Sequence, residues 1–324
     1  MMRRLLYITQ SGKNSKFAYY LRGYASWLVP AWVWRSQRER LLGEIDNRAD
    51  RDEIRARIDY YCRMKTPSVL PGTCPHIGDQ RIPKKRKVYY FDSREVTRYF
   101  APSLRWELLP GDITYIPDLP SIVKSRPLVA DVQNSTLLKM DKVRHFIFVN
   151  DPLSWDTKRP TAIFRGKVAG KQTRMDFMKR YFGSAVCDCG DVSRPGTVPS
   201  EWQVEKKTIR EHLEYRYIMA LEGNDVASNL KWVMSSNSIA VMPRPTCETW
   251  FMEGTLQPDY HYIEIKPDFS DLEERLIYYN NHPEEAKRII THAHEYVAQF
   301  RDTHRERLIA LGVMDKYLRM TNKQ

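Results

Sequence analysis

The clearest pattern of apolar and polar positions lies between residues 214 and 266. Every second side chain at its start is large and apolar, which is typical of a buried strand: Tyr215, Tyr217, Met219 and Leu221. Gly223 ends this strand, and apolar residues at helical spacing then predict a helix: Val226, Leu230, Val233 and Met234. Two short apolar runs, 238–243 and 261–265, predict further strands with a helix between them. Strands that alternate with helices predict an α/β fold with a parallel sheet.

The same patterns predict the other elements. Short apolar runs bounded by turn residues predict strands over 5–9, 87–91, 113–116 and 161–166. Apolar stripes at helical spacing predict helices over 38–65, from about 172, from Pro283 and over 301–318. A capping box at Ser270 and Glu273 predicts the start of one more helix. The polar, proline-bounded stretch Asp151–Pro160 predicts a domain boundary.

The segment Phe17–Trp34 is rich in Tyr and Trp and is flanked by Lys16 and Arg35. Aromatic side chains beside cations suit a membrane surface or an acceptor-binding groove. The same residues also suit a helix packed in the core of the first domain, which is the interpretation that we favour. No apolar run approaches the ~20 residues of a membrane span.

The composition narrows the class of protein. A chain of 324 residues has room for two domains of ordinary size. The net charge of +12 indicates an anionic partner, such as a nucleotide, a nucleic acid, a phosphorylated glycan or an anionic membrane, or else a solvated basic surface. Five cysteines without a regular spacing predict a reduced compartment and no structural zinc site.

Four stretches carry a family resemblance in their order along the chain. They are FRG at 164–166, GNDVASNLK at 223–231, ETWF at 248–251 and LQPDYHYIEIKPDFSDL at 256–272. In combination they resemble glycosyltransferase family 90, which includes Rumi-type protein O-glucosyltransferases, fungal capsule-associated xylosyltransferases and bacterial lipopolysaccharide core enzymes. The resemblance covers the second half of the chain well and the first half weakly.

The resemblance implies a GT-B architecture, in which two Rossmann-like domains face each other across a cleft and a C-terminal helix crosses back to the first domain. On this basis we expect an acceptor-side domain over 1–155, a domain that binds the nucleotide-sugar donor over 156–298 and a crossing helix over 299–324.

The donor site is expected where strands of the parallel sheet end, because backbone N–H groups and cations there stabilise phosphates. Arg174 matches the arginine that binds the diphosphate in the family, and Lys167 stands where the family commonly has serine. Glu248 is expected to bind the ribose hydroxyls. The full set of expected donor-binding residues is Arg165, Gly166, Lys167, Arg174, Gly223, Asn224, Asp225, Val226, Ala227, Ser228, Asn229, Lys231 and Glu248.

Asp118 is the candidate catalytic base. It lies between Pro117 and Pro120, on extended or turned backbone, where an aspartate commonly caps a turn. The resemblance implies the catalytic role, because family 90 uses a carboxylate in a D-x-P setting as base. Asp112 and Asp131 are the alternatives.

The segment 124–145 is the densest basic segment of the first half. Its residues Lys124 and Arg126 are the candidates for binding an anionic acceptor, and a solvated basic face is the alternative interpretation.

These observations predict an inverting glycosyltransferase that moves a sugar of glucose or xylose type from a UDP-sugar to a hydroxyl of lipopolysaccharide core or another bacterial surface glycan. We expect no cofactor and no metal, because no D-x-D motif follows an apolar strand. The expected partners are the nucleotide sugar, an anionic glycan or glycolipid acceptor and the anionic inner face of the bacterial inner membrane, with a cytoplasmic location and no nucleic acid. A basic nucleic-acid-binding protein and an inactive GT-B scaffold are the alternatives.

Overall fold

The computed structural model describes residues 12–323, which form two compact units. Unit 1 consists of the residues up to 14, 144–246 and 253–299, and unit 2 consists of 15–143, 247–252 and 300–324. The predicted strand over 5–9 lies outside the described residues. The predicted domains, 1–155, 156–298 and 299–324, stay a prediction.

Unit 1 is built on a five-stranded sheet in which every neighbouring pair is parallel. Its strands lie in the order β6 (Cys187–Asp191), β5 (Arg159–Gly166), β7 (Tyr215–Met219), β8 (Ile239–Met242) and β10 (Ile263–Glu264). The predicted α/β fold with a parallel sheet is therefore confirmed. The chain runs from β5 outward to β6 and then to β7 on the other side of β5, so the topological switch point lies between β5 and β7.

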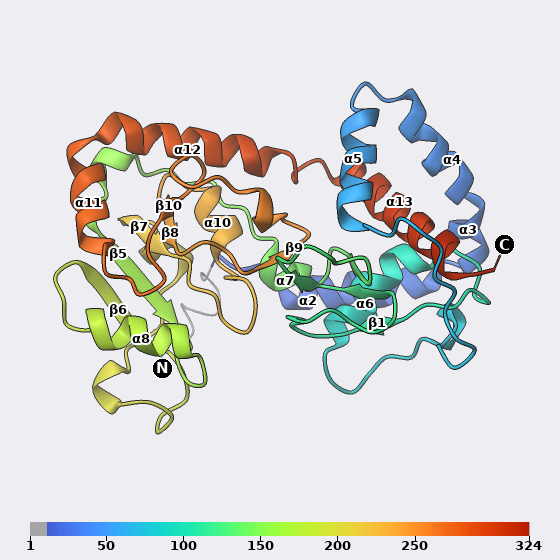
Figure 1. Cartoon of the computed structure of the whole chain (residues 1–324), viewed down its shortest axis with the longest axis horizontal. Helices are drawn as coiled ribbons and strands as arrows, with labels where there is room; N and C mark the ends of the chain where they lie inside the picture. The colour runs from blue at the N-terminus through green and yellow to red at the C-terminus, as the bar shows by residue number, and fades with distance from the viewer. Residues whose placement is uncertain (1–11, 324) are drawn as a thin grey trace. The chain divides into compact units, whose positions relative to one another are not determined.

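Helices of unit 1 pack on this sheet. They are α8 (Gln172–Tyr181), α9 (Ile209–His212), α10 (Leu230–Met234), α11 (Leu272–Asn281) and α12 (Pro283–Ala298). Helix α8 lies beside β6, while α11 and α12 pack against β5 and β8 (Figure 1). The helices predicted from about 172 and from Pro283 are confirmed, and Pro283 occupies the first turn, where its missing N–H costs nothing.

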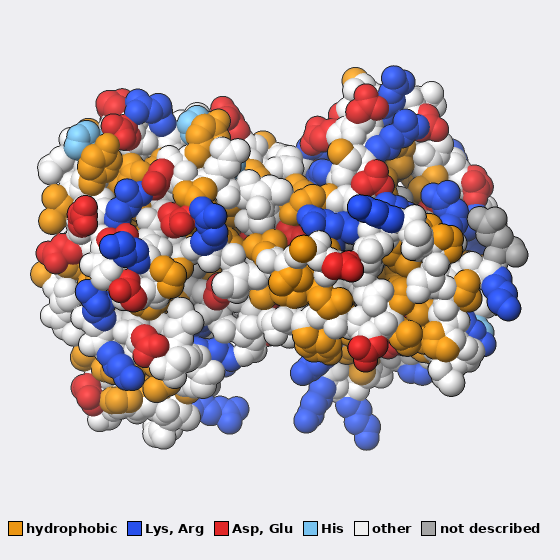
Figure 2. Space-filling view, in the orientation of Figure 1, with side chains coloured by type: hydrophobic (Ala, Val, Ile, Leu, Met, Phe, Trp, Pro, Cys, Tyr) orange, Lys and Arg blue, Asp and Glu red, His pale blue; other side chains and the backbone are white. Residues whose placement is uncertain are grey.

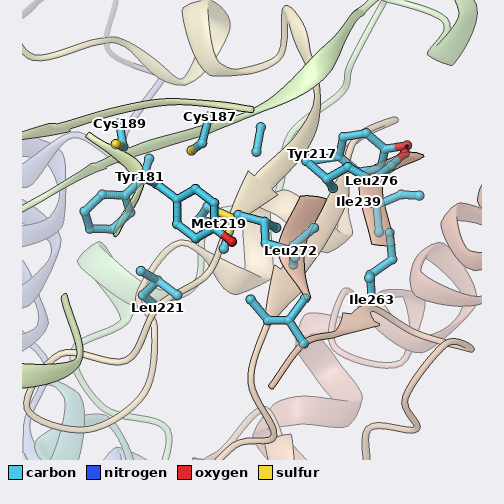
Figure 3. Close-up of a cluster of buried hydrophobic side chains, with 14 of the residues drawn as sticks. Tyr181, Cys187, Cys189, Tyr217, Met219, Leu221, Ile239, Ile263, Leu272 and Leu276 are labelled. Carbon is cyan, nitrogen blue, oxygen red and sulfur yellow. Dashed lines mark hydrogen bonds between the residues drawn. The ribbon is translucent and has the colours of Figure 1, made fainter. Parts of the chain in front are cut away.

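The two faces of the sheet have different environments because side chains alternate along each strand. Tyr217 and Met219 point into a large hydrophobic cluster that α8 and α11 complete, and Figure 3 shows them with Tyr181 and Leu272. Residues at the intervening positions, such as Ile218, lie on the opposite face. The cluster therefore fixes the orientation of the strands.

Unit 2 combines helices with two small sheets. Three parallel strands, β1 (Leu108–Leu109), β2 (Ser121–Val123) and β4 (Ser135–Leu137), form the first sheet. Strands β3 (Ser125–Pro127) and β9 (Cys247–Thr249) form an antiparallel pair. The helices are α2 (Lys16–Ala25), α3 (Ala31–Ser36), α4 (Arg38–Glu44), α5 (Arg51–Tyr61), α6 (Lys87–Thr97) and α13 (Thr303–Thr321). The short helix α7 (Lys142–His145) contains the point at which the chain passes from unit 2 to unit 1.

The last helix, α13, begins after Asp302, whose side chain accepts hydrogen bonds from the N–H groups of His304 and Arg305. It packs against α4, α5 and α6, and Tyr317 donates a hydrogen bond of 2.8 Å to the carbonyl of Pro120. The C-terminal helix is thus part of the same unit as residues 15–143.

Several predicted elements were wrong. The run 87–91 is the start of helix α6 and not a strand, no strand forms over 113–116, and strand β9 replaces the helix expected between 243 and 261. Helix α11 begins after Asp271 without a capping box, because the Asp268 side chain takes the N–H of Ser270. Strand β6 was missed.

The prediction that Phe17–Trp34 packs in the core was also wrong. Helices α2 and α3 and the 3₁₀ turn η1 (Ser26–Leu28) between them contain no buried residue. Phe17, Leu28 and Trp32 are 78%, 86% and 65% exposed. No helix within residues 12–323 combines the length and the apolar character needed to cross a membrane.

Candidate active site

Arg174 joins the two loops that meet at the switch point of unit 1. Its Nη1 donates to the carbonyl of Lys167 after β5, at 3.0 Å. Its Nη2 and Nε donate to the carbonyls of Leu221 and Glu222 after β7, at 2.7 and 3.0 Å. One guanidinium in the first turn of α8 therefore braces both strand ends.

Two glycines make room for this arginine. A Cβ at Gly166 would lie 2.7 Å from the Phe164 ring and 3.3 Å from the guanidinium, and a Cβ at Gly223 would lie 3.1 Å from the guanidinium. The glycines of the FRG and GND motifs are therefore needed for the close approach of Arg174.

Burial lowers the pKa of Arg174 to about 10, so the side chain stays charged at neutral pH. Its three hydrogen-bond acceptors are neutral carbonyls, and no carboxylate of residues 12–323 forms an ion pair with it. An anion bound nearby would therefore gain from this charge.

A cavity of about 360 Å³ lies next to these loops. Ile163, Arg165 and Ile218 border it from the sheet face opposite the hydrophobic cluster, and Met219 of the cluster lies at its edge. It is lined by Lys13, Ile163, Arg165, Lys167, Val192, Lys206, Lys207, Ile209, His212, Ile218, Met219, Ser228, Asn229 and Trp232. We call it the switch-point pocket. Five of these side chains are Lys or Arg and none is Asp or Glu, so the pocket attracts an anion.

Asp188 holds Arg165 in place at this pocket. Arg165 donates to the carbonyl and to Oδ1 of Asp188, at 2.6 and 2.5 Å, and Tyr215 donates to Oδ2 at 2.6 Å. Burial acts to raise the pKa of Asp188, but the hydrogen bonds from Tyr215 and Arg165 outweigh it and lower this pKa. Arg165 is consequently oriented, and part of its charge is already compensated.

One wall of the switch-point pocket is aromatic and apolar. The His212 ring meets the edge of Trp232 with 5.7 Å between the centroids. Burial, together with the positive charges of Arg165 and Lys207, lowers the pKa of His212 to about 4, so His212 is neutral at pH 7. Its Nδ1 donates to the carbonyl of Thr208 at 2.7 Å. Such a wall beside cations suits a ligand that joins an aromatic ring to phosphates.

The expected donor residues divide into three groups in the structure. Those that line the pocket are Arg165, Lys167, Ser228 and Asn229. Those that frame the loops beside it are Gly166, Arg174 and Gly223. Those buried within the loop between β7 and α10 are Asp225, Val226 and Ala227, while Asn224 of the same loop is exposed and accepts a hydrogen bond from Lys171.

Lys231 takes part in an ion pair in the structure, and its expected role at the donor stays a prediction. Its side chain is fully buried and forms an ion pair with the buried carboxylate of Glu253. Helix α10, in which it lies, has only five residues and begins at Leu230, so the long helix expected after Gly223 is not formed. The cations of the pocket, and not a long helix, therefore supply the positive potential.

Glu248 and Arg126, expected at the donor and the acceptor, pair with each other in the structure. They are register partners in the β3–β9 pair of unit 2, and Nε of Arg126 donates to Oε1 of Glu248 at 2.8 Å. Both side chains are buried, and Tyr60 donates a further hydrogen bond to Glu248. The pair holds β9 to the rest of unit 2, and the roles expected for Glu248 in ribose binding and for Arg126 in acceptor binding stay predictions.

Lys124 is likewise buried, and its ammonium group pairs with the carboxylate of Asp112. Lys124 is a predicted acceptor cation and Asp112 is one of the alternative bases, and in the structure these two residues form an ion pair with each other. The basic side chains of the 124–126 segment thus stabilise the interior of unit 2.

Asp118 lies on an exposed turn of unit 2. Asn134 donates from Nδ2 to the carbonyls of Pro117 and Asp118, at 2.9 and 3.0 Å, so the turn is held in place while the Asp118 carboxylate stays exposed. A cavity of about 440 Å³ adjoins this turn through Ile116 and Asn134; its lining is Met64, Thr66, Ser68, Ile116, Asp131, Gln133 and Asn134. Hydroxyl, amide and carboxylate groups of this kind suit a hydroxyl-rich ligand.

Three of the five cations of the switch-point pocket and its aromatic wall were not predicted from the sequence. Lys206 and Lys207 precede the short helix α9, whose start is a capping box of Thr208 and Glu211. The sequence shows this capping box, but it does not show that the box lies close to the ends of β5 and β7. The missed lining residues are Lys13, Lys206, Lys207, His212 and Trp232.

Comparison with known proteins identifies the family. The model of glycosyl transferase family 90 matches residues 133–310, which is more than half of the chain. The chain is 38% identical over 315 residues to the O-glucosyltransferase LpsA of Dichelobacter nodosus, covering 95% of this chain and 97% of that protein. It is 27% identical over 166 residues to the protein O-glucosyltransferase 3 of Rattus norvegicus, covering 49% of this chain and 32% of that protein. The chain therefore belongs to glycosyltransferase family 90 and is a glycosyltransferase.

Proposed function

We propose that this glycosyltransferase inverts the anomeric centre as it moves a sugar from a UDP-sugar to a hydroxyl of lipopolysaccharide core or another bacterial surface glycan. The observation that carries the proposal is the switch-point pocket, which gathers five cations and no carboxylate at the ligand-binding edge of a parallel sheet. The two relatives are named O-glucosyltransferases, which favours glucose over xylose as the sugar.

The switch-point pocket has groups for each part of a UDP-sugar. The uracil ring would pack against Trp232, and the side chains of Ser228 and Asn229 would hydrogen-bond to the donor. The diphosphate would lie close to the ammonium groups of Lys167 and Lys207. Because the diphosphate gains negative charge as the bond to the sugar breaks, these cations stabilise the transition state more than the bound donor. They supply the charge that a metal would otherwise bring, so we propose metal-independent transfer.

Asp118 would act as the base. Inversion requires a group that accepts the proton of the acceptor hydroxyl while this oxygen attacks the anomeric carbon from the side opposite the leaving diphosphate. The exposed carboxylate of Asp118, with the polar cavity beside it, suits that role. The role requires the GT-B arrangement of the two units, which is part of this proposal, with Asp118 facing the switch-point pocket.

The acceptor and the location belong to the same proposal. An anionic glycan or glycolipid at the cytoplasmic face of the bacterial inner membrane would suit a chain with a net charge of +12, which would then bind the membrane peripherally and not bind nucleic acid.

A panel of nucleotide sugars tests the donor class. UDP-sugars should raise the melting temperature, because a ligand at about a hundred times its Kd adds roughly 2.7 kcal/mol to the free energy of unfolding. UDP-glucose should stabilise most, and release of UDP with a glycan acceptor should follow. Stabilisation by none of the UDP-sugars would refute the proposal. Stabilisation without turnover on any acceptor would support the inactive scaffold, and salt-sensitive binding of random oligonucleotides would support the nucleic-acid-binding protein.

A further inference from the structure

Helix α2 and the 3₁₀ turn η1 that follows it expose a stripe of apolar side chains to solvent. Phe17, Leu21 and Tyr24 follow one another at intervals of four and three residues, so they share one face of α2, and Leu28 follows four residues later in η1. All four side chains are exposed, and Trp32 of the next helix is exposed as well. An amphipathic helix normally buries such a stripe in the core.

The opposite side of α2 is firmly attached to α6, which fixes the direction of the stripe. Tyr19 donates to Oδ1 of Asp92 at 2.7 Å and lies 3.2 Å from the carbonyl of Val88. Gly23 packs so closely on Phe91 that a Cβ would lie 2.6 Å from its ring. The exposed stripe is therefore held in place by the fold.

Cations surround the stripe in the sequence. No Asp or Glu precedes Glu39, while Lys16, Arg22 and Arg35 lie within α2 and α3 or beside their exposed apolar residues. All three cations are exposed. The segment thus combines apolar side chains with a positive charge that no acidic residue of the segment offsets.

A second basic segment lies at the start of α6, the helix on which α2 packs. Lys84 and Lys85 are exposed and form no ion pair with any residue that the structure describes. Lys85 also lines an apolar cavity of about 320 Å³ together with Tyr90, and the Tyr90 ring meets that of Trp27 with 6.3 Å between centroids. Figure 2 shows Lys and Arg side chains projecting beside hydrophobic ones on the part of the chain that contains α6.

We propose that this surface docks on an anionic lipid bilayer. We define the docking face as the exposed apolar residues of α2, η1 and α3 together with Lys84–Lys87. The rings and aliphatic side chains would enter the region of the lipid headgroups, and the cations would pair with anionic phosphates. This inference rests on the proposed function in one respect: docking would bring the transferase to an acceptor that is bound to the membrane.

A nucleic acid is the competing partner for a basic surface. It would account for the cations and for stacking on Trp32, but not for aliphatic side chains such as Leu21 and Leu28, which would remain exposed to water. The bilayer accounts for both kinds of side chain, so the observations favour it.

Co-sedimentation with vesicles tests the docking face without donor or acceptor. The protein should bind vesicles of phosphatidylcholine with about 30% phosphatidylglycerol and bind pure phosphatidylcholine far less. Lys84→Gln/Lys85→Gln should weaken binding about 30-fold, at about fivefold for each cation near the surface. Leu28→Ser/Trp32→Ser should weaken it at least tenfold, because both side chains lose the transfer into the interface.

Matched controls lie in unit 1. Lys179→Gln/Lys266→Gln removes two exposed lysines, and Ile277→Ser removes an exposed apolar side chain of α11. These variants should bind the anionic vesicles as the wild type does. Circular dichroism confirms that each variant is folded.

A second measurement needs no variant that disturbs the fold. Brominated lipids should quench part of the tryptophan fluorescence of the wild type, and Trp32→Phe should reduce the quenched fraction. The docking face is refuted if the wild type does not bind anionic vesicles, if both docking-face variants bind like the controls, or if a random oligonucleotide displaces the vesicles. Since UDP-sugar turnover on a soluble acceptor is measured separately, failure of docking leaves the proposed transferase intact, and failure of turnover leaves docking intact.

Discussion

Replacing Arg174 tests whether one side chain organises the donor site. The structure gives it three hydrogen bonds, to the carbonyls of Lys167, Leu221 and Glu222. At about 1 kcal/mol each, their loss in Arg174→Ala should lower the free energy of unfolding by about 3 kcal/mol. The two loops that it braces border the switch-point pocket, and its charge is lost as well, so affinity for UDP should fall at least tenfold, which is about 1.4 kcal/mol.

A conservative change separates bracing from charge. Arg174→Lys keeps the positive charge, but a single ammonium group cannot reach carbonyls on both loops. Arg174→Lys should therefore lose most of the stabilisation that the three hydrogen bonds provide, while it retains part of the affinity for UDP. Arg180→Ala, at the exposed end of the same helix, is the matched control and should change neither quantity.

Urea unfolding measures the stability of each variant, and titration calorimetry measures UDP binding to the folded protein. With turnover as a third readout, Arg174→Ala should lower donor affinity and the transfer rate together, because the diphosphate is charged before and during the reaction. The reasoning is refuted if Arg174→Ala unfolds like the Arg180→Ala control and binds UDP with the affinity of the wild type.

Three further predictions concern other residues. Asp118→Asn should lower kcat by roughly 10²–10⁴-fold with near-normal UDP binding, and Asp131→Asn should do much less; equal kcat values in steady-state assays would remove Asp118 as the base. Glu306→Ala should lower the free energy of unfolding in urea by about 3–5 kcal/mol, because it leaves the buried Arg57 without its carboxylate; a loss below about 1 kcal/mol would contradict this. The pKa of His212 is about 4 when folded, so the unfolded state binds more protons between pH 6.5 and 4 and stability should fall by roughly 3 kcal/mol as the pH drops through this window. His212→Gln should flatten that part of the pH profile, and an unchanged profile would contradict the assignment.

The sheet of unit 1 was predictable because its strands are apolar runs bounded by clear turn residues. Strands β5, β7 and β8 were predicted from this pattern alone. Strand β6 was missed because Asp188 and Gly190 interrupt its apolar character. The structure explains the departure: Asp188 holds Arg165, and a Cβ at Gly190 would lie 2.2 Å from Val204.

Helix α6 shows where local patterns fail. The run 87–91 contains a valine and three aromatic residues, which favour a strand when taken alone. In the structure Tyr89, Tyr90 and Phe91 are all buried, because different neighbours surround successive sides of the helix. A short apolar run that is buried on all sides fits either element, and packing decides between them.

The site was predictable where neighbouring residues in the sequence form it. The FRG and GND motifs do border the pocket, because FRG ends β5 and GND follows β7, and these two strands meet at the switch point. The pairing of Glu248 with Arg126 was not predicted, because it joins residues 122 positions apart, which no local pattern reveals. Lys207 was missed for the same reason, since only the fold brings it to the carboxyl ends of β5 and β7.

Calorimetric titration with UDP tests the central claim most directly, because it asks whether the switch-point pocket is the donor site. The wild type should bind UDP, and Lys167→Gln and Lys207→Gln should each weaken binding at least tenfold, as expected for the loss of a hydrogen bond between charged groups. Lys179→Gln/Lys266→Gln should bind UDP like the wild type. The claim is contradicted if the wild type does not bind UDP, or if it binds and both pocket variants retain the wild-type affinity.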